Sequence, residues 1–104
     1  MDEAKASMKE ATPLANMNQL HQYGRTLLQQ KKGKEAFEVF QMNYTKNPDQ
    51  FTTLMGMTRG YSAIGDYKKA LEFAEKALPK SPNKLNTDNI QRLIGLLKEG
   101  KDIN

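Results

Sequence analysis

The stretch FTTLMGMTRGYSAIGDYKKALEFAEKALPKSPNK, residues 51–84, decides the fold, because residues 17–50 directly before it follow the same pattern. When residues 17–50 are aligned with residues 51–84, identical residues fall on one another at several positions. The pairs are Leu20 and Leu54, Arg25 and Arg59, Lys34 and Lys68, Ala36 and Ala70, Glu38 and Glu72, Lys46 and Lys80, and Pro48 and Pro82. Internal similarity at a fixed period of this length is typical of stacked helical repeats. The sequence therefore predicts an all-α fold of paired antiparallel helices, and a function in binding rather than catalysis.

Apolar residues recur at helical spacing along the chain and never alternate for long, so strands are not expected. The expected turns contain, in order, Lys31-Lys32-Gly33, Asn47-Pro48, Gly65-Asp66 and Pro79. Gly65 can adopt the left-handed conformation that ends a third helix over about residues 50 to 64, and Asp66 can cap the fourth. Thr87 or Asp88 is expected to cap a fifth helix, which ends at Gly100.

Residues 2–12 are too few for a full repeat, but they align with residues 68–78 of the fourth helix. In this alignment Ala4 and Ala11 fall on Ala70 and Ala77. We therefore expect this segment to form the second helix of an incomplete preceding repeat, in which case the chain is a piece of a longer protein. An unstructured leader is the alternative interpretation.

The second copy contains Gly65-Asp66-Tyr67, Ala70, Ala74, Ala77 and Pro82, and the first copy contains Leu20, Gly24, Leu27, Ala36, Phe40 and Pro48. These residues resemble the tetratricopeptide repeat (TPR), a helix-turn-helix unit whose length matches the internal period of this chain. The resemblance implies a short right-handed solenoid of stacked repeats. The sequence departs from the family pattern at Lys31-Lys32-Gly33, where Gly-Asp-Tyr is preferred, and at Asn43, where a small apolar residue is usual.

The resemblance implies a single TPR-like domain over residues 1–104. Its parts are the incomplete repeat helix at 2–12, repeat 1 at 17–50, repeat 2 at 51–84 and a capping helix at 87–99. A capping helix is expected because the last repeat would otherwise expose its apolar face. A weaker resemblance, over residues 13–104, is to the C-terminal segment of secreted bacterial proteins with an uncharacterised N-terminal domain. It implies the bacterial periplasm or cell envelope, but a chain without cysteine also suits the cytoplasm.

The resemblance also implies a binding surface, since the first helices of successive TPR units line a concave groove. Carried over by position, the groove residues are Asn18, His21, Gln22, Arg25, Gln29, Thr52, Met55, Gly56, Arg59, Ser62 and Ala63. Arg25 and Arg59 hold the same place in consecutive repeats, and each guanidinium can grip a carboxylate through two parallel hydrogen bonds. We expect them to bind an acidic side chain or a C-terminal carboxylate of a peptide, with Met55 as an adaptable apolar contact. The alternative is that each arginine pairs with a carboxylate of its own chain.

Other kinds of site have less support in the sequence. The family's carboxylate clamp uses lysine and asparagine at positions that here hold His21, Arg25 and Gly56, so binding of chaperone tails is not implied. His21 is the only histidine and cysteine is absent, which excludes a histidine-rich or thiolate metal cluster. No nucleophile is paired with a base. The sequence therefore predicts no enzyme activity, no metal and no cofactor.

The sequence is compatible with three kinds of function. The first is an adaptor that binds a protein or peptide in the groove, with an acidic group held by the paired arginines. The second is a structural role, in which the array self-associates or docks against another domain of a longer chain. The third is RNA binding, suggested by the formal net charge of +4 but less favoured because the aromatic residues fall on core positions. The chain has no apolar run long enough to predict a membrane span.

Overall fold

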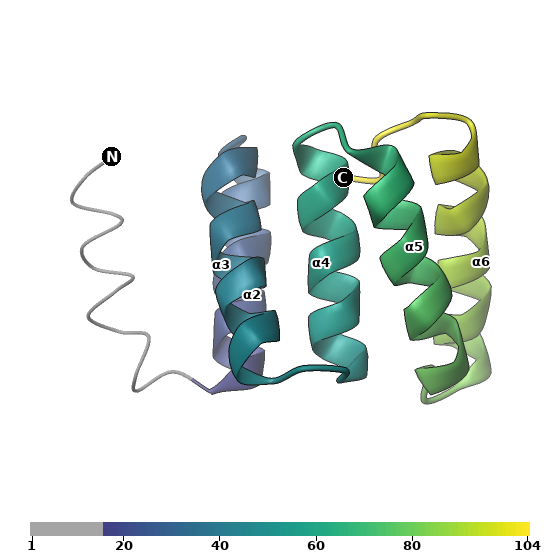
Figure 1. The fold of residues 1–104 in the computed structure, drawn as a ribbon, viewed down its shortest axis with the longest axis horizontal. Coiled ribbons are helices and arrows are strands. Elements are labelled where there is room, and N and C mark those ends of the chain that lie inside the picture. The colour runs from purple at the N-terminus through teal and green to yellow at the C-terminus, as the bar shows by residue number, and fades with distance from the viewer. Residues whose placement is uncertain (1–15) are drawn as a thin grey trace.

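The computed structural model describes residues 16–104, which form five α-helices and one short 3-10 helix. They are α2 (Met17–Gln29), α3 (Gly33–Lys46), α4 (Phe51–Ala63), α5 (Tyr67–Ala77), η1 (Leu78–Lys80) and α6 (Lys84–Lys98). Each helix packs against the next along the chain, and α2 also contacts α4 (Figure 1). The predicted all-α class is confirmed, while the helix predicted at residues 2–12 lies outside the described residues.

Side chains of asparagine and aspartate start three of these helices. Asn16 and Gln19 form a reciprocal capping box at α2, with Asn16 Oδ1 2.8 Å from Gln19 N and Gln19 Oε1 2.9 Å from Asn16 N. Asp66 caps α5, as predicted, by accepting a hydrogen bond from Lys69 N at 3.2 Å. These bonds satisfy backbone N–H groups that have no partner within the helix.

The expected cap of the last helix was wrong. The helix α6 begins at Lys84, before the predicted start at residue 87, and Asn83 caps it by accepting a hydrogen bond from Asn86 N at 2.9 Å. Thr87 lies within the first turn, where its hydroxyl donates to Asn83 O at 3.1 Å. Because the Asn83 side chain already accepts a hydrogen bond from a backbone N–H of the first turn, the helix needs no cap at Thr87 or Asp88.

The helices α2, α4 and α6 end in the same way. Each is followed by a residue with positive φ, at Lys31 (63°), Gly65 (84°) and Gly100 (72°). The accompanying hydrogen bonds run from Lys32 N to Leu27 O (2.9 Å), from Asp66 N to Tyr61 O (2.9 Å) and from Lys101 N to Leu96 O (3.0 Å). This is the Schellman arrangement, in which glycine is the usual left-handed residue. Lys31 also adopts the left-handed conformation, so the unusual Lys31-Lys32-Gly33 sequence still makes the tight turn.

Phe40 fills the space at which α2, α3 and α4 meet. Its side chain is fully buried, and the neighbouring helices present glycines to its ring. A Cβ atom on Gly24 would lie 2.6 Å from Phe40 Cζ, and one on Gly56 would lie 2.8 Å from Cδ1. These distances are shorter than van der Waals contact, so the helices reach this separation because the glycines have no side chains.

Asn43, the polar residue at a position where a small apolar residue is expected, is buried with 1% of its surface exposed. Its Nδ2 donates to Met17 O at 3.0 Å, and its Oδ1 accepts a hydrogen bond from Asn47 Nδ2 at 3.0 Å. Both polar atoms of the amide are therefore satisfied, as buried groups require. The hydrogen bond to Met17 ties the end of α3 to the start of α2.

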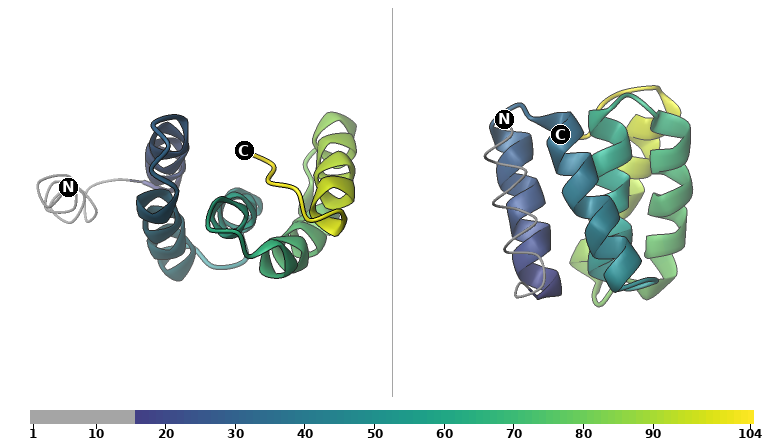
Figure 2. Two further views of the ribbon diagram at one scale, coloured as in Figure 1. Left: turned by 90° about the horizontal axis from the view of Figure 1, so that it is seen from above. Right: turned by 60° about the vertical axis from the view of Figure 1, so that its left-hand side comes forward.

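The helices follow an arc when seen from above. The helices α2, α4 and α6 border its inner side, α3 and α5 lie on its outer side, and the residues after α6 turn inward (Figure 2). Two hollows lined by residues of α2 and α4, described below, lie on this inner side. None of the helices in residues 16–104 combines the length and the apolar character needed to cross a bilayer.

Candidate functional site

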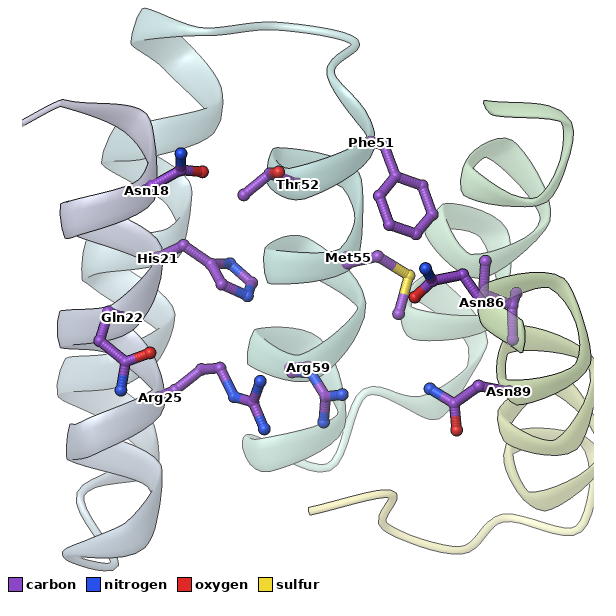
Figure 3. Close-up of a pocket in the computed structure, with 11 residues that line it drawn as sticks. Asn18, His21, Gln22, Arg25, Phe51, Thr52, Met55, Arg59, Asn86 and Asn89 are labelled. Carbon is purple, nitrogen blue, oxygen red and sulfur yellow. The ribbon is translucent and has the colours of Figure 1, made fainter. Parts of the chain in front are cut away.

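A hollow of about 330 Å³ lies between α2, α4 and α6 on the inner side of the arc (Figure 3). The residues that line it are Asn18, His21, Gln22, Arg25, Phe51, Thr52, Met55, Arg59, Asn86, Asn89 and Ile90. On each helix, successive lining residues are three or four positions apart, except for one adjacent pair. Residues with this spacing lie on one face of a helix, so each of the three helices contributes one face to the lining of the hollow.

A second hollow of about 310 Å³ adjoins the first. Arg25, Leu28, Gln29, Lys31, Arg59, Ile103 and Asn104 line it. Arg25 and Arg59 belong to both hollows, so the two guanidinium groups stand where the hollows meet. The chain after α6 forms one wall of the second hollow, where Asn104 Nδ2 donates to Arg59 O at 2.9 Å.

The structure places the predicted groove residues in three kinds of position. Seven of them line the first hollow, namely Asn18, His21, Gln22, Arg25, Thr52, Met55 and Arg59, and Gln29 lines the second. Gly56 lies behind this surface, against Phe40 and His21. Ser62 and Ala63 line neither hollow: Ser62 is buried, and Ala63 contacts Gly33 of α3 and borders a separate apolar hollow.

Ser62 is covered by the segment that follows α6. Its hydroxyl donates to Asp102 Oδ1 at 2.6 Å and accepts a hydrogen bond from Ile103 N at 3.0 Å. Ile103 also packs against the apolar core formed by α4, α5 and α6. This segment therefore occupies the end of the α4 inner face that sequence position alone assigns to a ligand.

Sequence reasoning missed four residues of the first hollow, Phe51, Asn86, Asn89 and Ile90. Three of them belong to α6, which was expected only to cover the last repeat. The spacing of Asn86, Asn89 and Ile90 puts them on one face of the helix, and two amides on a face that carries a buried isoleucine are the signal that could have identified them.

Arg25 and Arg59 reach into the first hollow from neighbouring helices (Figure 3). Arg25 is exposed and Arg59 is partly buried. Within residues 16–104 neither guanidinium has an ion pair or a side-chain hydrogen bond, so the alternative of pairing with a carboxylate finds no support in the described part of the chain. Burial, followed by the positive charges of Arg25 and Arg92, lowers the pKa of Arg59.

His21 lies beside the two arginines and is neutral at pH 7. Burial, followed by the charges of Arg59 and Arg25, lowers the pKa of the imidazole to about 4. Its buried Nδ1 has no hydrogen-bond partner within the described residues, and the ring centroid lies 5.5 Å from that of Phe40. In the charged imidazolium, Nδ1 would carry a proton and would be a buried donor without an acceptor. Its environment therefore agrees with the neutral form. His21 therefore packs as an aromatic wall of the hollow.

The depressed pKa of His21 predicts a loss of stability in acid. Between about pH 6.5 and pH 4 the unfolded chain binds a proton at His21 that the folded chain does not bind. The stabilising effect of the neutral ring is thus complete above pH 6.5 and is lost as the pH falls toward 4. The shift corresponds to about 2 to 3 kcal/mol of unfolding free energy, after allowance for the part of the ring that faces solvent.

Urea unfolding of the wild-type protein and of His21→Gln at pH 7, 5.5 and 4 measures this effect, since the carboxylates titrate alike in both. We expect the wild-type protein to lose more stability than the variant over this range. An imidazole that titrates near pH 6.5 by NMR in the folded protein would contradict the prediction.

Residues 16–104 contain no group of three or more histidine, cysteine, aspartate or glutamate side chains placed to hold a metal ion. The features of the candidate site are thus a polar hollow, two arginines without an anionic partner in this part of the chain and a neutral histidine. Comparison of the chain with protein-family models, with curated proteins and with solved structures found no match.

Proposed function

We propose that the chain is a non-catalytic interaction module that binds an acidic segment of a protein or peptide in the hollow between α2, α4 and α6. The observation that carries this proposal is the pair Arg25 and Arg59, which face one hollow with no anionic partner among residues 16–104. Two neighbouring positive charges repel each other, and an anion between them would remove the repulsion. A carboxylate would also gain charge-assisted hydrogen bonds from each guanidinium.

We infer that the scaffold of this module is a short array of two TPR-like repeats. The alignment of residues 17–50 with residues 51–84 places both ends of α2, Met17 and Gln29, on the two ends of α4, Phe51 and Ala63. It also places the first residue of α3 on the first residue of α5. Similar left-handed turns close α2 and α4. This agreement between the sequence period and the helix bounds supports a right-handed repeat array in which α6 covers the second repeat.

Binding of a fluorescein-labelled acidic peptide, followed by anisotropy, tests the proposed function. The double variant Arg25→Gln, Arg59→Gln is expected to bind about 100-fold more weakly, because it removes at least two charge-assisted hydrogen bonds. The matched control is Lys68→Gln, Lys69→Gln, which removes the same charge from exposed positions on α5. We expect this control to lose affinity only slightly. Equal losses in the two variants would show attraction by net charge rather than a site, and would contradict the proposal.

A role in self-association or docking is the second candidate. The observation in its favour is a hollow of about 620 Å³ lined by Gly33, Lys34, Phe37, Glu38, Ala63 and Ile64. Ile64 at its edge is 44% exposed, and Leu85 elsewhere on the surface is 80% exposed. Exposed apolar surface of this kind is often covered by another protein surface. An apparent mass that rises with protein concentration would favour this candidate.

RNA binding is less favoured. Most described aromatic rings pack on one another, with Tyr61 stacked on Phe73 and Phe37 edge-on to Tyr61. Phe51 is the aromatic residue other than His21 that lines the first hollow. Single-stranded nucleic acid is usually held by several exposed rings on which successive bases stack.

A further inference from the structure

The helix α6 contributes an oriented hydrogen-bond donor to the hollow. Arg92 Nη2 donates to Asn89 Oδ1 at 2.8 Å, which engages the oxygen of the amide. The Nδ2 of Asn89 is then left to donate, and it points from α6 toward the side on which Arg59 lies (Figure 3). Donors from α2, α4 and α6 thus face the same space, in the form of Arg25, Arg59 and Asn89.

Positive charge exceeds what one carboxylate would neutralise at this place. The charges of both Arg25 and Arg92 act on Arg59, and no aspartate or glutamate of residues 16–104 lines either hollow. A carboxylate carries one negative charge and two oxygens. A phosphoryl group on a side chain carries about −1.5 to −2 at pH 7 and three strong acceptor oxygens. Its charge and its number of acceptors therefore fit the three donors better.

We propose that the hollow binds a phosphorylated side chain of the partner peptide, with the phosphoryl group held by Arg25, Arg59 and Asn89 and with Arg92 positioning Asn89. This inference rests on the proposed function, because it specifies which acidic group the hollow receives. The apolar side chains of Phe51, Met55 and Ile90 line the same hollow and supply contacts for the carbon atoms that carry the phosphoryl group. The volume of about 330 Å³ lies within the usual range of small-ligand sites.

Three matched peptides test the choice of ligand: acetyl-Gly-Gly-X-Gly-Gly-amide, with X as phosphoserine, glutamate or serine, titrated at pH 7 and constant ionic strength. Two-dimensional NMR follows the side-chain amide of Asn89 and the Nε–H groups of Arg25 and Arg59. We expect the phosphoserine peptide to bind at least tenfold more tightly than the glutamate peptide, and the serine peptide not to bind. Inorganic phosphate is expected to compete, but more weakly than the phosphoserine peptide.

Variants of α6 test the arrangement of donors. Asn89→Asp places a carboxylate in the hollow and is expected to weaken phosphopeptide binding at least tenfold. The control is Gln91→Glu, which adds the same charge at an exposed position of the same helix outside the hollow. Arg92→Gln is expected to weaken binding several-fold, and Arg92→Lys to restore part of it, because lysine can still donate to the Asn89 oxygen. Thermal melts of all variants confirm that the fold is retained.

The failures of the two proposals are distinguishable. Equal affinity for the phosphoserine and glutamate peptides, with both dependent on Arg25 and Arg59, would overturn this inference and leave the proposed function intact. Phosphopeptide binding that Asn89→Asp and Gln91→Glu weaken equally would overturn the role of α6. If inorganic phosphate binds as tightly as the phosphopeptide, the proposal that the phosphoryl group comes from a peptide side chain is wrong. If neither the phosphoserine nor the glutamate peptide binds, and longer acidic peptides also fail, both proposals are wrong.

Discussion

Leu93→Asp is expected to unfold the domain at 25 °C. Leu93 is 1% exposed and belongs to the cluster in which α6 meets the buried alanines of α5, including Ala70 and Ala74. The substitution removes a large apolar side chain and leaves a carboxylate without a partner in its place. Together these effects cost about 5 kcal/mol or more, which is comparable to the total stability of many small domains.

The same helix provides the control for this prediction. Leu85 is 80% exposed, so Leu85→Asp introduces the same charge without removing a core side chain, and its stability should stay close to that of the wild-type protein. Far-UV circular dichroism and urea unfolding measure both variants. A cooperative urea transition of Leu93→Asp at the wild-type midpoint would mean that α6 does not close the core at this residue.

Gly24→Ala is expected to destabilise the protein by about 3 kcal/mol, although alanine is the better helix former. The added methyl group would lie 2.6 Å from Phe40 Cζ, and the ring cannot retreat easily because Gly60 of α4 lies at its opposite edge, where a Cβ atom would be 3.3 Å from Cδ2. The helices α2 and α3 must therefore separate, or Phe40 must leave its position. Either response disturbs packing that reaches from α2 to α4.

Two further substitutions make this prediction specific. Apart from the neighbouring residues and the backbone of its own helix, no atom of residues 16–104 lies within 4 Å of a Cβ placed on Gly95 of α6, so Gly95→Ala should stabilise the protein by up to about 1 kcal/mol through helix propensity alone. Phe40→Leu, combined with Gly24→Ala, should cost less than the sum of the two single changes, because leucine leaves room for the methyl group. Strict additivity in urea unfolding would show that the ring and Gly24 do not compete for the same space.

Local features of the chain predicted the helices well. The apolar period, the turn at Gly65 and the cap at Asp66 all depend on residues close together in the sequence, and the structure contains each of them. The error at the start of α6 had a local cause as well. Asn83 and Thr87 are both good capping residues, and the pattern did not reveal which of them accepts the first-turn hydrogen bonds.

The candidate site was predictable in part, because helical spacing puts His21, Arg25 and Arg59 on the faces that meet at the hollow. Ser62 has the same spacing, yet it is covered by Asp102, a residue 40 positions later in the chain. No local pattern encodes a hydrogen bond over that distance. No local pattern shows that Asn89 lines the hollow either. Its position there depends on the packing of α6 against α5, which follows the arc of helices (Figure 2).

The sequence by itself determined the number and order of the α-helices in the described chain and the register that puts Arg25 and Arg59 at equivalent places. Helix periodicity, caps and turn residues act within a few positions, and they are visible in the letters. The tertiary structure alone decided which part of the inner face stays open. That outcome depends on contacts between segments distant in the chain, such as the hydrogen bond from Asn104 to Arg59 O. It also depends on the fact that no aspartate or glutamate side chain of residues 16–104 lines either hollow.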